Sequence, residues 1–154
     1  MPSDNRTSHM HIALDEARDA AARGEVPVGA VLVSPRGDIV ARDGNRTRAL
    51  SDPSAHAEML VIRTGAKRLG SERLVDHDLY VTLEPCAMCA AVISFARIRR
   101  LYFGASDPKM GAVLHGPKLF SQASCHHAPE IYDGIAETEA SELLRTFFAA
   151  LRDR

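Results

Sequence analysis

Hydrophobic residues along the chain alternate between helical spacing and short apolar runs. In residues 9–23 apolar side chains recur at near-helical intervals with acidic residues between them, and Gly24 follows, which predicts an amphipathic helix. Residues 28–34 form a mostly apolar run between Pro27 and Pro35, which is typical of a buried strand. Residues 35–38 predict a turn and residues 38–42 a second strand, so the two strands form a hairpin.

The rest of the chain continues this alternation. Residues 55–69 have helical spacing, end at Gly70 and follow Ser54, whose hydroxyl can cap a helix. Residues 79–83 predict a buried strand, and a helix with two cysteines begins near Pro85. Residues 100–104 and 130–132 predict two more strands, separated by a long loop of a kind that is often functional. Residues 136–152 predict a terminal helix whose apolar stripe, with Phe147 and Phe148, should pack in the core.

This order of elements predicts the α/β class. We expect a three-layer α/β/α fold in which helices cover both faces of a mixed five-stranded sheet. Residues 9–154 should form a single domain, and residues 1–8 a disordered N-terminus. The helices that start near residues 55 and 85 should begin at the same edge of the sheet.

The composition is typical of a globular protein, with 45% apolar and 25% charged residues among 154. The polar start is no signal peptide, and no apolar run reaches the roughly 18 residues of a membrane span. Three cysteines do not make a disulfide framework, so we expect a cytoplasmic protein with no membrane association. The net charge of −1 requires any RNA-binding surface to be local. Basic clusters that serve RNA binding or are simply solvated are Arg46 with Arg48, Lys109 with Lys118, and Arg97 with Arg99 and Arg100.

A metal site is the main chemical signal. Cys86 and Cys89 are one helical turn apart at a helix start, where the helix dipole favours thiolates. His56, thirty residues upstream of Cys86, can supply a third ligand. Three protein ligands leave a tetrahedral zinc one position for water, which is the catalytic arrangement.

Two other interpretations of the cysteine pair remain open. A redox disulfide would need a thioredoxin-like βαβ context, which the order of elements lacks. A structural zinc would need a fourth ligand, and Cys125, beside His126 and His127, is the candidate. Otherwise Cys125 is a free thiol, and the two histidines are surface residues.

Glu58 follows His56 by two residues. A helical glutamate is ordinarily exposed, but beside a metal ligand it predicts a general acid–base that accepts the proton of the zinc-bound water. Zinc lowers the pKa of such a water to about 7. Because the two residues lie about 200° apart on an ideal helix, both can reach one site only from the first turn.

The segment His56-Ala57-Glu58, followed by Pro85-Cys86-Ala87-Met88-Cys89, resembles the signature of the zinc-dependent nucleobase deaminases. Within that superfamily the chain is most similar to the bacterial tRNA-specific adenosine deaminases. This similarity runs from about residue 9 to residue 148 and includes residues 25–30, 44–46, 52–53, 80–85, 97–98, 103–105, 107 with 109, and 147–148.

The resemblance implies a cytidine deaminase-like fold, one Zn²⁺ per chain, Glu58 as the catalytic residue and a homodimer. It also implies that a small set of residues contacts the substrate, namely Val28, Asn45, Ala57, Asp107 and Lys109. The metal ligands would be His56, Cys86 and Cys89.

The function that follows is hydrolytic deamination of adenosine to inosine at the wobble position (34) of a tRNA anticodon stem-loop. An alternative in the same class is a free-base or nucleoside deaminase that acts on guanine or cytosine. An alternative of another class is a non-catalytic, zinc-stapled RNA-binding subunit. The presence of Glu58 argues against that last alternative, because a structural zinc site needs no carboxylate there.

Overall fold

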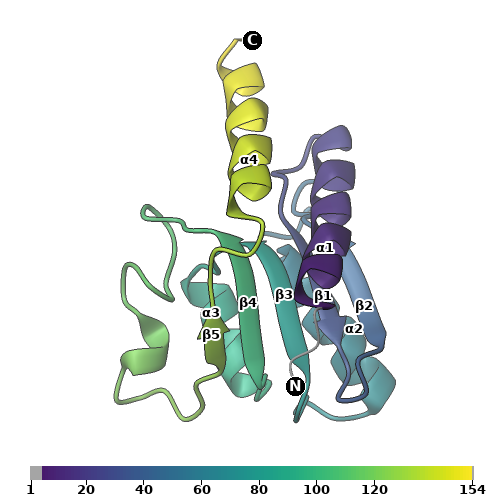
Figure 1. The fold of residues 1–154 in the computed structure, drawn as a ribbon, viewed down its shortest axis with the longest axis vertical. Helices are drawn as coiled ribbons and strands as arrows, with labels where there is room; N and C mark the ends of the chain where they lie inside the picture. The colour runs from purple at the N-terminus through teal and green to yellow at the C-terminus, as the bar shows by residue number, and fades with distance from the viewer. Residues whose placement is uncertain (1–4, 154) are drawn as a thin grey trace.

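The computed structural model of the protein describes residues 5–153 and has a five-stranded sheet between two layers of helices (Figure 1). The strands are β1 (Gly29–Val33), β2 (Ile39–Gly44), β3 (Asp78–Leu83), β4 (Arg100–Ala105) and β5 (Glu130–Tyr132). The helices are α1 (Asn5–Ala22), α2 (Ala57–Leu69), α3 (Ala87–Phe95), α4 (Glu137–Arg152) and the short 3-10 helix η1 (Leu119–Ser121). The predicted α/β class and three-layer arrangement are confirmed.

The sheet is mixed, with the strand order β2-β1-β3-β4-β5. β1 pairs antiparallel with β2 and with β3, whereas β3, β4 and β5 run parallel. Parallel neighbours end at the same edge of a sheet, so the segments that follow β3 and β4 leave it side by side. The cysteine segment follows β3 and the long loop follows β4, so the fold brings these two segments together.

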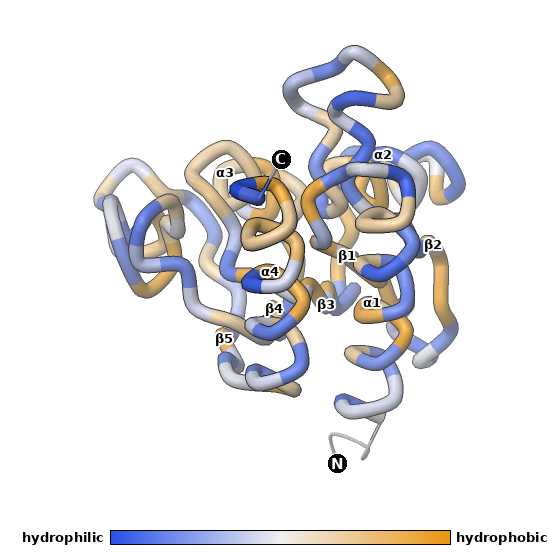
Figure 2. Tube along the Cα trace, turned by 90° about the horizontal axis from the view of Figure 1, so that it is seen from above, coloured by the Kyte–Doolittle hydropathy of each residue, from blue (hydrophilic) through white to orange (hydrophobic). Residues whose placement is uncertain are grey.

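β1 is buried along its whole length because helices cover both faces of the sheet. Ala30 and Leu32 belong to the core shared with α2 and α3, whereas Val31 and Val33 pack with residues of α1. This alternation is the two-residue period of a strand. Gly29 lies directly under α1, where a Cβ would overlap the carbonyl oxygen of Ala13. Figure 2 shows the hydrophobic stretches along the strands and hydrophilic stretches in the outer loops.

The N-terminal helix is longer than the sequence pattern predicts. α1 begins at Asn5, so residues 5–8 of the segment that we expected to be disordered are helical. Residues 1–4 of that segment lie outside the described residues. The division into one domain from residue 9 to residue 154 stays a prediction. Within residues 5–153, no helix is both long and apolar enough to cross a bilayer.

The terminal helix α4 packs on the sheet through its first half and then extends past the other elements (Figure 1). Ala140 is buried, whereas Phe148 is 41% exposed. Phe147 is only half-buried, so the prediction that these two phenylalanines pack in the core is wrong. The apolar stripe of this helix is real, but its second half continues beyond the sheet that could cover it.

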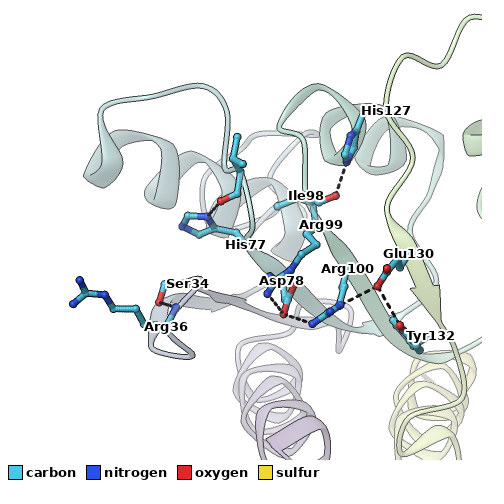
Figure 3. A network of polar contacts seen from close by, with 11 residues as sticks. Ser34, Arg36, His77, Asp78, Ile98, Arg99, Arg100, His127, Glu130 and Tyr132 are labelled. Atoms are coloured by element: carbon cyan, nitrogen blue, oxygen red, sulfur yellow. Dashed lines mark hydrogen bonds and ion pairs between the residues drawn. The ribbon is translucent and has the colours of Figure 1, made fainter. Parts of the chain in front are cut away.

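A polar network ties the starts of the three parallel strands together (Figure 3). Arg99 donates two hydrogen bonds to the carboxylate of Asp78, at 3.0 and 3.1 Å. Arg100 donates to Glu130 at 2.9 Å, and the hydroxyl of Tyr132 donates to the same carboxylate oxygen at 3.1 Å. Arg99 and Arg100 thus bind carboxylates of the sheet, which favours a structural role over RNA binding for these two arginines.

Candidate metal centre and active site

Two helix N-termini meet beyond the carboxyl end of β3. β3 ends at Leu83, Cys86 is the N-cap of α3, and Cys89 lies one turn further along that helix. His56 is the N-cap of α2, and its imidazole lies close to both sulfurs. The expectation that both helices begin at the same edge is confirmed, and it places the three candidate ligands around one point.

The side chain of Asn45, which directly follows β2, accepts the first N–H of α2, and Ser54 does not. The N–H and the hydroxyl of Ser54 both donate to the carboxylate of Asp52, at 2.9 and 2.7 Å, so the prediction that Ser54 caps this helix is wrong. The helix begins at Ala57, whose N–H donates to the side-chain oxygen of Asn45 at 2.8 Å. This hydrogen bond fixes the backbone next to His56.

The three candidate ligand atoms are spaced as a zinc ion requires. Nδ1 of His56 lies 3.7 Å from Sγ of Cys86 and 3.5 Å from Sγ of Cys89, and all three atoms lie within 4.8 Å of one another. Ordinary Zn–N and Zn–S bonds at a tetrahedral angle would hold nitrogen and sulfur about 3.6 Å apart. The two nitrogen–sulfur distances therefore fit a bound zinc ion. Within residues 5–153 no fourth histidine, cysteine or carboxylate joins the group, which favours a catalytic over a structural site.

Cys125 lies elsewhere, near the end of α3. Its sulfur is 3.4 Å from the hydroxyl of Ser94 and donates to the carbonyl oxygen of His127 at 3.1 Å. The imidazole of His127 bonds the carbonyl oxygen of Ile98 at 2.7 Å. These contacts hold the loop that leads to β5, and they give no support to a four-ligand zinc site that includes Cys125.

The two candidate cysteine ligands differ in how readily they ionise. A hydrogen bond from the thiol of Cys89, joined by one from His56, outweighs burial and lowers the pKa of Cys86 to about 4. The pKa of Cys89 is raised, because its thiol donates to Cys86 and is buried. One sulfur thus carries negative charge already, and a divalent cation would drive the second deprotonation.

Glu58 is buried next to this cluster, with an exposed fraction of only 4%. Burial raises its pKa to about 6, while its own backbone N–H, the imidazole of His56 and the thiol of Cys89 act in the opposite direction. A carboxyl group with a pKa close to neutral can both accept and return a proton. Glu58 lies in the first turn of α2, as we expected from the sequence if it shares a site with His56.

The predicted base-binding residues are contiguous in the structure. The N–H of Asn45 donates to the carbonyl oxygen of Val28 at 3.1 Å, and its side-chain oxygen is taken by Ala57. The side-chain N–H₂ group of Asn45 is then the part that remains for a ligand, as a donor. Val28 and Ala57 are buried beside it. That these three residues contact substrate stays a prediction.

Asp107 and Lys109 line a groove of about 870 Å³ that lies between their loop and α4. Leu83, at the end of β3, contributes to the same groove, so it begins next to the cysteine segment. The carboxylate of Asp107 accepts the N–H groups of Lys109 and Met110, at 3.2 and 3.0 Å, and so shapes its own turn. The substrate contacts of Asp107 and Lys109 stay predictions, and the groove is where they would occur.

Two further buried carboxylates received no role from the sequence. Glu25 and Glu84 are both 2% exposed. Glu25 accepts the N–H groups of Arg48 and Ala49, at 3.1 and 2.8 Å; burial acts to raise its pKa, but these and other hydrogen bonds outweigh it and lower the pKa. Their positions in the sequence could have indicated such a role, because a glutamate next to a buried apolar run needs hydrogen-bond donors for its carboxylate.

Residues 3–105 match the family model of the cytidine and deoxycytidylate deaminase zinc-binding region. The chain belongs to this deaminase family. Within it, the tRNA-specific adenosine deaminase of Agrobacterium fabrum is 62% identical over 147 residues, which cover 96% of each protein. The tRNA-specific adenosine deaminase of Bacillus subtilis is 42% identical over 146 residues, with 95% of this chain and 90% of that protein covered.

Solved structures of deaminases share the fold. One from studies of A-to-I editing by tRNA:A34 deaminases at the wobble position of transfer RNA has a TM-score of 0.88 and 62% identity, and covers 90% of this chain and 99% of that one. A guanine deaminase from Nitrosomonas europaea has a TM-score of 0.75 at 20% identity, with 93% of this chain and 84% of that one covered. The second comparison shows the common fold alone. The first supports the predicted cytidine deaminase-like fold and the tRNA-specific branch of the family.

Proposed function

We propose that this deaminase converts adenosine to inosine at the wobble position (34) of a tRNA anticodon stem-loop. The observation that carries the proposal is the group of three candidate zinc ligands, His56, Cys86 and Cys89. The buried carboxyl of Glu58 lies beside this group. The similarity of almost the whole chain to tRNA-specific adenosine deaminases supports the choice of substrate. The overall reaction consumes one water and releases ammonia.

The chemistry divides between metal and protein. Zinc, when bound by His56, Cys86 and Cys89, supplies the Lewis acidity that makes the attacking water ionise near neutral pH. The carboxylate of Glu58 accepts the proton of that water and delivers it to N1 of the adenine ring as C6 is attacked. The carboxylate of Glu58 then takes the remaining proton from the hydroxyl now on C6 and passes it to the amino group, so that ammonia leaves, C6 keeps a carbonyl oxygen and Glu58 returns to its starting state.

Substrate contacts follow from the groups that the fold leaves available. The side-chain N–H₂ of Asn45 can donate to an acceptor on the base, because its oxygen is committed to Ala57. Val28 and Ala57 would form apolar walls of the base pocket. Lys109 is exposed at the groove beside the site, where an ammonium group can bind an RNA phosphate. An anticodon loop presents bases that are already partly unstacked, so extrusion of the target base costs little.

We further propose a cytoplasmic homodimer. The site needs free thiols, which a reducing compartment maintains. Phe95 at the end of α3 is 71% exposed, and an apolar side chain of that size on the surface is suited to an interface between two copies. Sedimentation velocity should give a dimer for the wild type and a smaller species for Phe95→Asp.

The decisive assay compares substrates. Ammonia release should occur with a synthetic anticodon stem-loop that carries adenosine at position 34, and not with free guanine, cytosine or adenosine. Turnover of a free base without turnover of the RNA would establish the free-base alternative instead. Binding of the RNA by a zinc-loaded protein without any turnover would establish the non-catalytic alternative.

A further inference from the structure

Glu84, at the carboxyl end of β3, is a buried carboxylate that the proposed chemistry does not use. Its side chain has no exposed surface. One of its oxygens accepts from the N–H of Asp107 at 3.0 Å and from Nδ1 of His115 at 2.8 Å. The other accepts three successive backbone N–H groups, those of Val113, Leu114 and His115, at 3.1, 2.9 and 3.2 Å. Successive N–H groups that converge in this way form an anion site, and here a side chain fills it.

The loop of residues 107–115 is also joined to the metal-ligand segment. Gly111 forms an isolated bridge with Cys86, and the N–H of Ala112 donates to the carbonyl oxygen of Pro85 at 2.9 Å. A Cβ at position 111 would lie 2.5 Å from the carboxylate of Glu84, so the contact requires glycine. Residues 107–115 are therefore held to the cysteine segment both by these backbone contacts and by the carboxylate of Glu84.

The same loop carries the groove residues Asp107 and Lys109. The carboxylate of Asp107 is occupied within its own turn, and its backbone N–H is what reaches Glu84. Without the carboxylate of Glu84, the N–H groups of residues 107 and 113–115 lose a buried acceptor and must turn toward water. The backbone that carries Lys109 to the groove would then lose one of its attachments.

We propose that Glu84 is a positioning residue that holds the loop of residues 107–115 in its RNA-binding conformation and thereby sets the KM for the stem-loop. The proposal rests on the proposed function, because it takes RNA as the ligand of the groove. It assigns Glu84 no contact with substrate or with the reacting atoms, so its effect on kcat should be small.

The main test is Glu84→Gln, which keeps the shape but replaces one acceptor oxygen by an N–H₂ group that faces backbone donors. On the anticodon stem-loop we expect KM to rise about tenfold, with kcat per bound zinc within about twofold of the wild type. Amide hydrogen exchange of residues 113–115 should also accelerate. The control is His126→Ala, an exposed histidine of the same long loop, which should leave KM and exchange unchanged. A normal KM, or normal exchange, in Glu84→Gln would overturn the proposal.

A second variant decides the matter if Glu84→Gln loses zinc or does not fold. His115 is 34% exposed, so His115→Ala removes one of the five donors with little loss of packing. We expect its KM to rise about threefold with kcat retained, and a KM equal to that of His126→Ala would refute the proposal. A wild type that does not deaminate the stem-loop refutes the proposed function instead, while exchange in His115→Ala still tests the anchoring role of Glu84.

Discussion

The side-chain oxygen of Asn45 lies 2.8 Å from the backbone nitrogen of Ala57, so this amide accepts the first N–H of α2, next to His56. The two halves of this amide have separable tasks. The oxygen accepts an N–H at a helix N-terminus, and we propose that the N–H₂ group donates to the base. A substitution that keeps one half and changes the other can therefore separate folding from catalysis.

Asn45→Asp should keep the cap, because a carboxylate accepts the N–H of Ala57 and suits a helix N-terminus. It replaces the N–H₂ donor by an acceptor, so kcat/KM on the stem-loop should fall about 10- to 100-fold. Zinc content and the melting temperature should stay close to those of the wild type. Asn45→Ala, which removes both halves, should lose stability as well. Full activity of Asn45→Asp would show that the amide donor does not contact the base.

Glu58→Gln should fold and bind zinc but lower kcat by about 10²- to 10⁴-fold, because proton transfer at the water and at N1 loses its carrier. Single-turnover inosine formation measures this without interference from product release. Glu72→Gln, at an exposed position just after α2, is the matched control and should be fully active. Near-normal turnover of Glu58→Gln would remove this residue from the mechanism.

Metal content should depend on two of the three cysteines. Cys86→Ser should reduce bound zinc from one equivalent per chain to well below half, since a neutral hydroxyl is a much weaker ligand than a thiolate. Cys125→Ser should retain the full equivalent, because Cys125 contacts Ser94 and His127 and not the metal cluster. Metal analysis after dialysis measures both. Zinc loss in Cys125→Ser would revive the structural four-ligand site.

Stability should fall with acid because of His9. This residue is 8% exposed, packs edge-on against Tyr80 with ring centroids 5.0 Å apart, and has no hydrogen-bond partner for Nδ1 among the described residues. Burial lowers the pKa of His9 below its ordinary 6.5, against an opposing effect of Asp78. The unfolded chain therefore takes up the proton first, and stability that is present above pH 6.5 is lost as the pH falls toward the pKa of the folded state.

The corresponding variant is His9→Phe, which keeps a ring against Tyr80 but cannot titrate. Its free energy of unfolding in urea should change less between pH 7 and pH 5 than that of the wild type. The control is His11→Asn, which removes an exposed histidine of the same helix and should leave the wild-type slope. An unchanged slope in His9→Phe would show that other groups cause the acid sensitivity.

The sequence was sufficient for the order of elements, because helical and strand periodicity are local properties that burial enforces. It also pointed to the candidate metal ligands that the fold brings together, since the spacing of Cys86 and Cys89 places both sulfurs on one side of a helix start. The family resemblance then supplied the reaction. Helix ends were less well predicted: α2 begins at Ala57 because Asn45 reaches it from the end of β2, and no pattern within residues 54–57 contains that information.

What the sequence determined by itself was therefore the set of elements and the choice of His56, Glu58, Cys86 and Cys89 as candidate site residues, which the fold brings together. The tertiary structure alone decided which loops flank that chemistry and what holds them, as with Glu84, whose five donors come from residues 107–115. It also decided that the end of α4, with Phe148, extends past the sheet. The physical reason is that periodicity and spacing record what neighbours along the chain require, whereas the partners of a buried charge and the end of a packed layer depend on segments that meet only in the folded state.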